Sequence, residues 1–338
     1  MLGKAASPSP TRALPQAAPS CHDGAMKRPS SPARAPASVA RLAAALMLPL
    51  LGAAADPPKP PAAPRPTTAD ILKNAPADAW ASIAADDLLL IDMADGRRVT
   101  IWLASGYAPV HVANIRTIAR SGWWRDSWVY RVQDNYVTQW GDPTEKKVPP
   151  PGINATPPAE YDWPAAKSSV TRNPFSDAYA RQTGFSDDGW AIAGNGKRQW
   201  LPHCYGAVGV SRNFAPDTGT GTDLYTVIGH APRHLDRNIA LVGRVIDGMA
   251  ALSALPRGTG GGLGLYENVK LYVPIAQIRL ASDLPVAEQP HWDYLKPRTP
   301  SFAAYRDSRA NRQPPFFTVP ANAADLCNIP VPVRRVVG

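Results

Sequence analysis

The sequence predicts a mainly β protein whose strands close into an antiparallel barrel capped by two helices. Short apolar runs rich in β-branched residues recur between positions 88 and 280, and turn residues separate them. Only two segments in this region show helical spacing of their apolar residues. Many short strands with few helices are typical of a closed or nearly closed barrel. With 338 residues, 44% of them hydrophobic, the chain is long enough to bury a substantial core.

Residues 1–55 predict a leader followed by a secretory signal peptide. Basic residues follow Met26, which we expect to be the true start, and the apolar run Leu42–Leu51 comes next. Small residues then favour cleavage near Ala55. The apolar run is well short of the ~20 residues that span a bilayer. We therefore expect a periplasmic or secreted protein without stable membrane insertion after cleavage.

The formal charge of +9 is misleading as a sign of nucleic-acid binding. Residues 1–55 hold six basic residues and one acidic residue, which leaves 30 basic and 26 acidic residues beyond them. This excess is modest and forms no Lys/Arg stripe along the sequence. We therefore expect no nucleic-acid partner.

Residues 56–87 predict a linker with a short helix. Proline dominates residues 56–66, and such a composition favours a stiff, extended chain. A helix is expected from Thr68 to Ala84, with Asp70 in its first turn. The folded domain then begins at Leu88.

Residues 88–284 predict the barrel domain. Leu88–Met93 and Arg98–Leu103 form an expected hairpin, because Ala94-Asp95-Gly96 is a strong turn signal. A helix is expected from Pro109, ended by Gly122 at the position where glycine commonly terminates helices. The remaining expected elements are strands at Trp128–Gln133, Tyr136–Trp140, Ala207–Val210, Leu224–Ile228, Ile239–Val245 and Leu271–Leu280, and a second helix at Gly248–Leu255.

Two other segments differ in composition from the barrel. Residues 143–202 are rich in Pro, Gly and Asp, and they predict a long loop insertion with one helical turn around Ser176–Arg181. Residues 285–338 are rich in proline and aromatic residues, and we expect this C-terminal extension to wrap the barrel surface.

Common cofactor and metal motifs are missing from the sequence. The glycine run 258–264 does not fit the spacing of a dinucleotide-binding loop, and a flexible loop is the preferred interpretation. His230 and His234 lie four residues apart, but Pro232 separates them and no third ligand is evident. We therefore expect neither a metal nor a cofactor. If the leader is removed, Cys204 and Cys327 remain, and a disulfide and two free buried thiols are both open.

The segment most informative about function is residues 129–142, VYRVQDNYVTQWGD. Alternation along a strand predicts that Val129, Arg131 and Gln133 share one face, and that Val137 and Gln139 share a face of the next strand. An Arg and a Gln among Tyr and Trp residues can form a polar patch in an aromatic groove. A surface arginine on an ordinary hairpin is the plainer alternative, because charged strand residues usually face solvent.

This segment resembles the signature of the cyclophilin family of peptidyl-prolyl isomerases. The resemblance extends in the same order across 88–281, interrupted by the insertion at 143–202. It predicts a cyclophilin-like β-barrel for residues 88–284. The matching positions are Arg131, Val132, Tyr136, Gln139, Gly141 and Asp142; Val99–Leu103, Ala108-Pro109 and Val112–Asn114 upstream; and His203, Gly206–Arg212, Leu224-Tyr225, His234–Asp236 and Gly243–Met249 downstream.

The resemblance implies catalysis of rotation about X–Pro bonds. That reaction needs a proline pocket and a donor to the twisted amide nitrogen, and no nucleophile, metal or cofactor. Arg131 is the implied donor, and Gln139 would position it or the substrate carbonyl. The implied partners are proline-containing polypeptides in the cell envelope, and we expect a monomer. The implied substrate-binding residues are Tyr136, Val137, Asp223, Leu224, Tyr225, His234 and Ile239; core packing is a serious alternative for Val137 and Leu224.

Several positions depart from the family pattern. Asp223 (or Thr222) stands where the family has a second Gln, His234 where a Trp is frequent, and Ile239 where many members have His. Tyr130 replaces the His that precedes the catalytic Arg. A peptide-binding module or chaperone with little turnover is therefore the main alternative to an isomerase. An all-β carbohydrate binder is a weaker alternative that the ten Trp residues raise.

Overall fold

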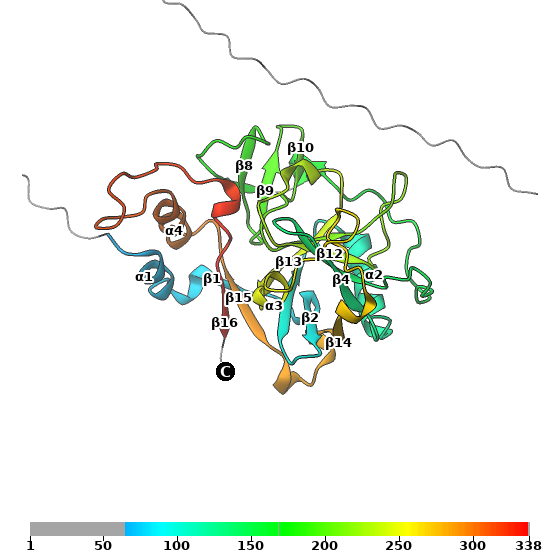
Figure 1. Cartoon of the computed structure of the whole chain (residues 1–338). Helices are drawn as coiled ribbons and strands as arrows, with labels where there is room; N and C mark the ends of the chain where they lie inside the picture. The colour runs from blue at the N-terminus through cyan, green and yellow to red at the C-terminus, as the bar shows by residue number, and fades with distance from the viewer. Residues whose placement is uncertain (1–64, 168, 337–338) are drawn as a thin grey trace, which may run out of the picture. The chain divides into compact units, whose positions relative to one another are not determined.

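The computed structural model describes residues 65–167 and 169–336, and its centre is a closed antiparallel barrel (Figure 1). The barrel strands are β2 (Leu88–Met93), β3 (Arg98–Leu103), β4 (Trp128–Val132), β5 (Val137–Gly141), β11 (Ala207–Val210), β12 (Leu224–Val227), β13 (Leu241–Asp247) and β14 (Val273–Leu280). They follow the order β11-β12-β5-β4-β14-β2-β3-β13, and β11 pairs with β13 to close the ring. The predicted closed barrel is confirmed.

Both faces of strand β2 are buried, which explains its uninterrupted apolar sequence. Leu89 and Ile91 belong to the cluster inside the barrel, whereas Leu88 and Leu90 belong to a second cluster on its outer face. Because side chains alternate along a strand, the outer set needs a cover of its own. Chain outside the barrel supplies it, through Trp163, Trp190, Ile192 and Trp292.

Two helices cap the barrel, as predicted. Helix α2 (Pro109–Arg120) buries Val112 and Ile115 in the interior cluster, and Gly122, whose φ is +69°, follows its C-cap residue Ser121. The N–H groups of Gly122 and Trp123 close the helix by bonding the carbonyls of Ala119 and Ile118. Helix α3 (Ala250–Ser253) is shorter than predicted, and it packs Ala251 and Leu252 into the same cluster.

The segment expected to be a long loop is instead built around a small antiparallel sheet. Its strands are β6 (Trp163–Pro164), β7 (Val170–Arg172), β8 (Gln182–Ser186), β9 (Ala191–Gly194) and β10 (Arg198–Trp200), in the order β6-β10-β9-β8-β7. The loop prediction was wrong because each strand has only two to five residues, too few to show alternation. The predicted helical turn at Ser176–Arg181 does not form.

The described chain before β2 and after β14 folds together around a second sheet, and we call this part the C-terminal module. Helix α1 (Thr68–Lys73) stops well before the predicted end at Ala84, because Asn74 caps it and Pro76 follows. The other elements are β1 (Trp80–Ser82), β15 (His291–Leu295), helix α4 (Pro300–Ala310) and β16 (Val333–Val336), and the strands pair in the order β1-β15-β16. The predicted helix is therefore shorter than expected, and residues 77–87 continue as 3₁₀ turns and strand β1.

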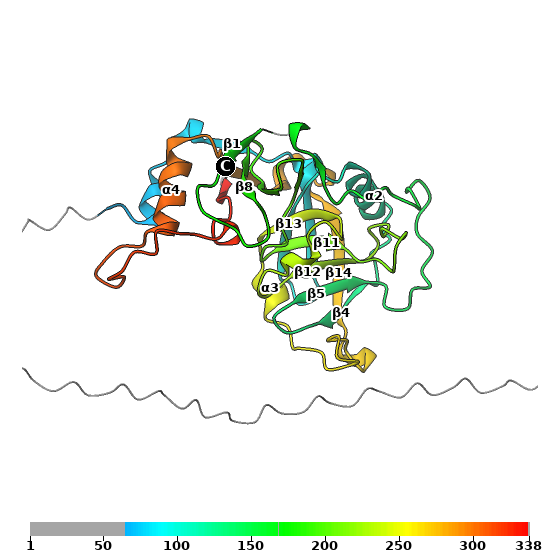
Figure 2. The same ribbon diagram turned by 90° about the horizontal axis from the view of Figure 1, so that it is seen from above.

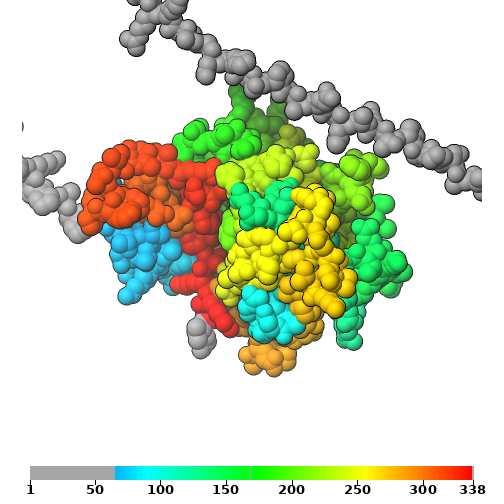
Figure 3. All heavy atoms as spheres, viewed as in Figure 1, coloured from blue at the N-terminus to red at the C-terminus, as the bar shows by residue number. Residues whose placement is uncertain are grey.

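The two ends of the described chain lie side by side in this module. The space-filling view shows the blue and the orange-to-red segments packed together (Figure 3), and the Thr68 hydroxyl hydrogen-bonds the Ser308 hydroxyl at 2.9 Å. Helices α1 and α4 lie on the side of the molecule away from α2 (Figure 2). Phe302 and Trp80 of this module share a core cluster with Phe185 of the insertion.

Short 3₁₀ turns complete the secondary structure of the described residues. They lie in the connections between the strands. The turns are η1 (Ala77–Ala79), η2 (Ala85–Asp87), η3 (Ala165–Lys167), η4 (Arg233–Leu235), η5 (Val269–Leu271), η6 (Ala281–Asp283), η7 (Val286–Glu288) and η8 (Leu326–Asn328).

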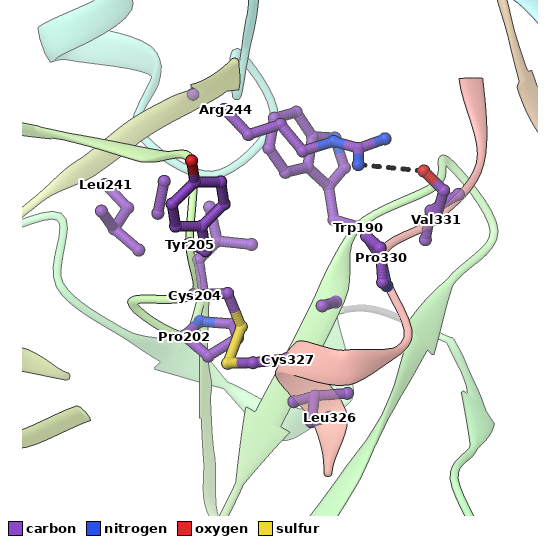
Figure 4. Close-up of a pocket in the computed structure, with 14 residues that line it drawn as sticks. Trp190, Pro202, Cys204, Tyr205, Leu241, Arg244, Leu326, Cys327, Pro330 and Val331 are labelled. Atoms are coloured by element: carbon purple, nitrogen blue, oxygen red, sulfur yellow. Dashed lines mark hydrogen bonds between the residues drawn. A yellow bond between two sulfur atoms is a disulfide. The ribbon is translucent and has the colours of Figure 1, made fainter. Parts of the chain in front are cut away.

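A disulfide between Cys204 and Cys327 ties the C-terminal module to the barrel domain. It settles the alternative that the sequence left open, in favour of a bridge. Beside it lies a cavity of about 70 Å³, where the barrel, the insertion and the C-terminal module meet (Figure 4). The predicted signal peptide and residues 56–64 of the predicted Pro-rich linker lie outside the described residues.

Candidate active site

Strands β4 and β5 bring Arg131 and Gln139 directly opposite each other. The register between the two strands shifts at Tyr130, which marks a β-bulge. A bulge adds one residue, so Tyr130 and Arg131 both lie outside the barrel core while Val129 and Val132 both lie within it. The predicted shared face of Val129 and Arg131 is therefore wrong, because strict alternation fails at a bulge.

Three neutral acceptors hold the guanidinium of Arg131. Its Nη1 donates to Oε1 of Gln139 at 3.0 Å, and its Nη2 donates to Oε1 of Gln133 at 2.5 Å. Its Nε donates to the carbonyl of Leu263 at 2.6 Å, from the glycine-rich loop that follows α3. Burial lowers the pKa of Arg131 from its usual high value. The side chain nevertheless stays charged at neutral pH, because an arginine is not deprotonated in proteins. The side chain is thus fixed in place without a carboxylate partner among these contacts.

The amide of Gln139 has its orientation set by its other contacts. Its Nε2 donates to the hydroxyls of Tyr130 and Ser211, the latter at 3.0 Å. Its Oε1 is therefore left to accept from Arg131. Gln139 acts as a bridge between the arginine and the strands around it, which agrees with its expected positioning role.

Tyr225 forms the floor beside this polar pair. It pairs with Gln139 across β12 and β5, and only 5% of it is exposed. Gly209 lies opposite on β11, where a Cβ atom would come within 2.3 Å of the Tyr225 hydroxyl oxygen. The missing side chain of Gly209 thus lets the tyrosine ring lie flat on the sheet.

Tyr136 and His234 lie beside Arg131, and we call the surface around these residues the groove and the two rings its rim. Their rings are stacked with centroids 6.1 Å apart, and the Arg131 guanidinium lies 6.0 Å from the centroid of the Tyr136 ring. Val137 belongs to the outer-face cluster that also holds Tyr225, and Ile239 packs against that cluster. Of these expected substrate-binding residues, the structure places Tyr136 beside Arg131 and His234 against Tyr136.

Two expected substrate-binding residues lie elsewhere. Leu224 is fully buried in the cluster inside the barrel, on the opposite face of β12 from Tyr225, so it cannot contact a peptide in the groove. Asp223 lies behind the site, where its Oδ1 accepts a hydrogen bond from Tyr130 at 2.8 Å. Leu224 is thus a core residue, and Asp223 supports the site through Tyr130.

A buried polar network lies beneath the groove floor. The Tyr225 hydroxyl lies 2.9 Å from Nε2 of His203, and Nδ1 of His203 lies 3.0 Å from Oδ1 of Asp236. Burial alone would raise the pKa of Asp236, but the His203 hydrogen bond and the Arg233 charge hold it below its ordinary value. Burial lowers the pKa of His203, so a neutral ring donates from Nδ1 to the carboxylate and accepts from Tyr225 at Nε2.

The insertion contacts the rim turn η4 through this network. Arg233 donates to Asp236 at 2.7 Å and to Asp177 of the insertion at 2.9 Å, and both of these pairs are almost fully buried. Trp200 on β10 also donates its indole N–H to Asp236. The insertion therefore supports the turn that carries His234. Sequence reasoning missed these contacts because no local pattern marks a pair so far apart in the chain.

The cavity beside the disulfide is a weaker candidate for a binding site. It is lined mainly by apolar side chains, with the Arg244 guanidinium at one edge (Figure 4). Nη1 of Arg244 donates to the carbonyl of Val331, and the charge lies 5.1 Å from the Trp102 ring centroid and 5.8 Å from that of Trp190. Burial lowers the pKa of Arg244 to about 10. Ring faces thus stabilise this cation, and we interpret the cavity as a packing junction.

Within the described ranges, no cluster of three His, Cys, Asp or Glu side chains could hold a metal ion. In the same ranges, no helix is long and apolar enough to cross a bilayer. His230 and His234 are therefore not joined by a third ligand in this part of the chain. The chemistry of the groove rests on Arg131, its amide partner and the aromatic floor.

Comparisons with known proteins bear on the family and the fold of the chain. The profile of the family described as cyclophilin type peptidyl-prolyl cis-trans isomerase/CLD matches residues 88–279. The chain is similar in structure to the cyclophilin AquaCyp293 from Hirschia baltica, with 23% identity and a TM-score of 0.61 over 76% of this chain and 94% of that one. It also matches a cyclophilin-type isomerase of Cryptosporidium parvum, determined in the presence of the dipeptide Ala-Pro, with 14% identity and a TM-score of 0.36 over 57% of this chain and 98% of that one. No curated protein matches it by sequence.

The family profile covers more than half of the chain, and it spans all eight barrel strands apart from the last residue of β14. The Hirschia baltica structure supports the same fold. The chain therefore belongs to the cyclophilin family and is a peptidyl-prolyl cis-trans isomerase.

Proposed function

We propose that the isomerase groove, defined by Arg131, Gln139, Tyr136 and Tyr225, catalyses X–Pro rotation in proteins that fold outside the cytoplasm. The observation that carries this proposal is the guanidinium of Arg131, fixed by Gln139 above an aromatic floor. The arrangement offers one cationic donor beside an apolar surface. A prolyl isomerase needs both.

The chemistry of rotation explains why such a donor is sufficient. The barrier is ~20 kcal/mol because the planar amide is conjugated. In the twisted state the proline nitrogen becomes pyramidal, and its lone pair becomes a better hydrogen-bond acceptor. A donor aimed at that nitrogen binds the transition state more tightly than either planar state.

Arg131 has the donor capacity for this role. A guanidinium has five N–H groups, and Gln133, Gln139 and Leu263 accept from three different nitrogens. The remaining N–H groups, one on each terminal nitrogen, are available to a peptide. Tyr136 is half-buried beside Arg131 and offers an aromatic face for the proline ring, and Tyr225 and Val137 lie almost fully buried in the apolar cluster against which it packs.

The disulfide supports a site of action outside the cytoplasm. Cysteine pairs such as Cys204–Cys327 persist in oxidising compartments and are rare in the reducing cytosol. The predicted signal peptide points in the same direction. Proline-containing proteins that fold in the cell envelope are the proposed substrates.

The enzymatic part of the proposal is tested by exchange NMR on a proline-containing tetrapeptide. The full chain is compared with Arg131→Ala and with Arg335→Ala, which removes an exposed arginine on β16. We expect Arg131→Ala to lower kcat/KM by about 100-fold, since removal of one transition-state donor costs this much in other enzymes. Arg335→Ala should behave as wild type. A folded wild-type chain that gives no acceleration would favour a peptide-binding module on the same barrel.

The location is tested separately by expressing the full chain in a bacterium and fractionating the cells. We expect a periplasmic or secreted product whose N-terminus, measured by mass spectrometry, lies at or near Asp56. Cytoplasmic retention of an unprocessed chain would contradict export and leave the enzymatic result untouched.

A further inference from the structure

We propose that Tyr130 and Asp223 are positioning residues, which orient the Gln139 amide and thereby fix Arg131 for catalysis. This inference rests on the isomerase function proposed for the groove. Neither side chain needs to touch the peptide. Both differ from the family pattern described above, where a His precedes the arginine and a Gln stands at or next to position 223.

The hydrogen-bond directions carry the argument. The Tyr130 hydroxyl donates its single proton to Oδ1 of Asp223 at 2.8 Å. Its oxygen can then only accept from Gln139, so the Nε2 side of that amide must face Tyr130. The Oε1 side must face Arg131, which donates to it at 3.0 Å. If the Gln139 amide were flipped, its N–H groups would face the N–H groups of Arg131, which is unfavourable.

We call the hydrogen-bonded series Asp223–Tyr130–Gln139–Arg131 the relay, and local backbone features hold it in place. The bulge in β4 places Tyr130 on the same side of the sheet as Arg131. On β5, a Cβ atom at Gly141 would come within 2.2 Å of Oδ1 of Asp223, so the glycine makes room for the carboxylate. The backbone N–H of Asp142 also bonds that carboxylate. The relay is therefore supported from three strands, β4, β5 and the chain entering β12.

The protonation state of Asp223 controls the direction of the relay. Burial raises the pKa of Asp223 to about 6, and the charges of Asp142 and Glu145 add to the rise, while the Tyr130 hydrogen bond opposes it. Tyr130, Asp142 and Glu145 are the titratable groups with the largest influence on this carboxylate in the part of the chain that the structure describes. Below pH 6 the protonated carboxyl can donate to Tyr130, and the phenol proton can then turn toward Gln139. Tyr130 then no longer requires the Nε2 side of Gln139 to face it, so the orientation of the amide, and with it the acceptor of Arg131, is no longer fixed.

The test measures kcat and KM by exchange NMR between pH 5 and 8 on a capped tetrapeptide, using the full chain. We expect wild-type kcat to fall as pH drops through about 6, the pKa of Asp223. Asp223→Asn keeps an acceptor for Tyr130 but cannot titrate, so its profile should be flat. Glu145→Gln removes a nearby negative charge and should move the wild-type midpoint to lower pH.

Tyr130→Phe removes the relay hydroxyl at all pH values. We expect kcat to fall about tenfold, in line with the loss of one buried hydrogen-bond link, while KM stays close to wild type. Tyr272→Phe is the matched control, because its ring lies 6.4 Å from that of Tyr130 and its hydroxyl has no hydrogen-bond partner among the described residues. Wild-type kcat and pH profile in Tyr130→Phe would overturn the proposal.

A second readout separates this inference from the activity itself. In protein labelled with ¹⁵N at Arg and Gln, the side-chain signals of Arg131 and Gln139 should shift near pH 6 in wild type. The same signals should stay constant in Asp223→Asn. If wild type proves inactive but these shifts occur, the isomerase proposal fails and the positioning relay stands. If the signals do not respond to pH in either protein, the relay is refuted.

Discussion

The hydroxyl of Tyr225 donates a hydrogen bond to Nε2 of His203, 2.9 Å away, beneath the floor of the isomerase groove. His203 is fully buried, and its Nδ1 in turn bonds Asp236. A Phe at this position could not make this bond. In this chain the floor of the groove is thus connected to the buried network that reaches the insertion.

We predict that Tyr225→Phe lowers stability while preserving catalysis. The aromatic ring that faces the proline remains, but Nε2 of His203 is left buried without a donor. An unsatisfied buried acceptor costs about 1–3 kcal/mol in the free energy of unfolding, which urea denaturation can measure. Tyr205→Phe is the control, because Tyr205 is 53% exposed. Unchanged stability in Tyr225→Phe would show that this hydrogen bond adds no net stability.

We predict a larger effect from Asp177→Ala, which breaks the ion pair between the insertion and Arg233. The two side chains are only 1% and 3% exposed. Arg233 keeps Asp236 as a partner but loses its other buried carboxylate, and removing one partner from a buried ion pair costs up to about 3–5 kcal/mol. Asp307→Ala removes the partner of Arg306, in a pair whose aspartate is 61% exposed, and should cost less than about 1 kcal/mol.

The comparison of these two aspartates by urea denaturation also tests the role of the insertion. Rim residue His234 lies on the turn that carries Arg233. If Asp177→Ala still folds, its KM for the peptide should rise, because the rim turn loses its support. Equal stability of the two variants would mean that the insertion does not hold the rim.

The barrel could be predicted from the sequence because its strands carry strong local signals. Leu88–Met93 and Arg98–Leu103 are apolar and β-rich, and the turn between them contains Gly96 with a φ of +87°. The insertion carried no such signal. Its strands are short, and Phe185 and Trp200 gain their cover from the C-terminal module, which is distant in sequence.

The site could be predicted in its composition but not in its geometry. Arg131, Gln139 and Tyr136 were expected to meet, and the structure brings them together. Leu224 and Tyr225 are adjacent in sequence and were assigned to the same pocket, yet alternation along β12 places them on opposite faces of the barrel wall. The bulge at Tyr130 likewise depends on the pairing of two strands, which a single sequence does not reveal.

We predict that loss of the Cys204–Cys327 disulfide destabilises the fold. The bridge closes a chain segment with a sequence separation of 123 residues. Constraining a loop of that length in the unfolded state is worth about 3–5 kcal/mol in the chain-entropy account. The double variant Cys204→Ser/Cys327→Ser should lose about this much stability in denaturation experiments. Reductant should lower the stability of wild type toward that of the variant and leave the variant unchanged; a wild type indifferent to reductant would contradict the prediction.

We predict that Gly141→Ala displaces the Asp223 carboxylate and thereby disturbs the relay. The new Cβ would lie 2.2 Å from Oδ1 of Asp223, and the φ of +152° at this position disfavours any residue with a side chain. Backbone strain alone should cost about 1–3 kcal/mol of stability. Displacement of the carboxylate should also lower kcat, because Tyr130 loses its acceptor and Gln139 its fixed orientation.

A double-mutant cycle separates the two effects of Gly141→Ala. Asp223→Ala removes the group that the new methyl meets, so in that background Gly141→Ala should cost only the backbone strain. It should also leave kcat where Asp223→Ala alone has placed it, because the relay is already broken. A coupling energy of about 0.5–3 kcal/mol between the two sites is expected for residues in contact. If the losses of stability and of kcat are both additive, Gly141 acts only through its backbone conformation. The absence of a side chain at Gly141 is then not needed to make room for the Asp223 carboxylate.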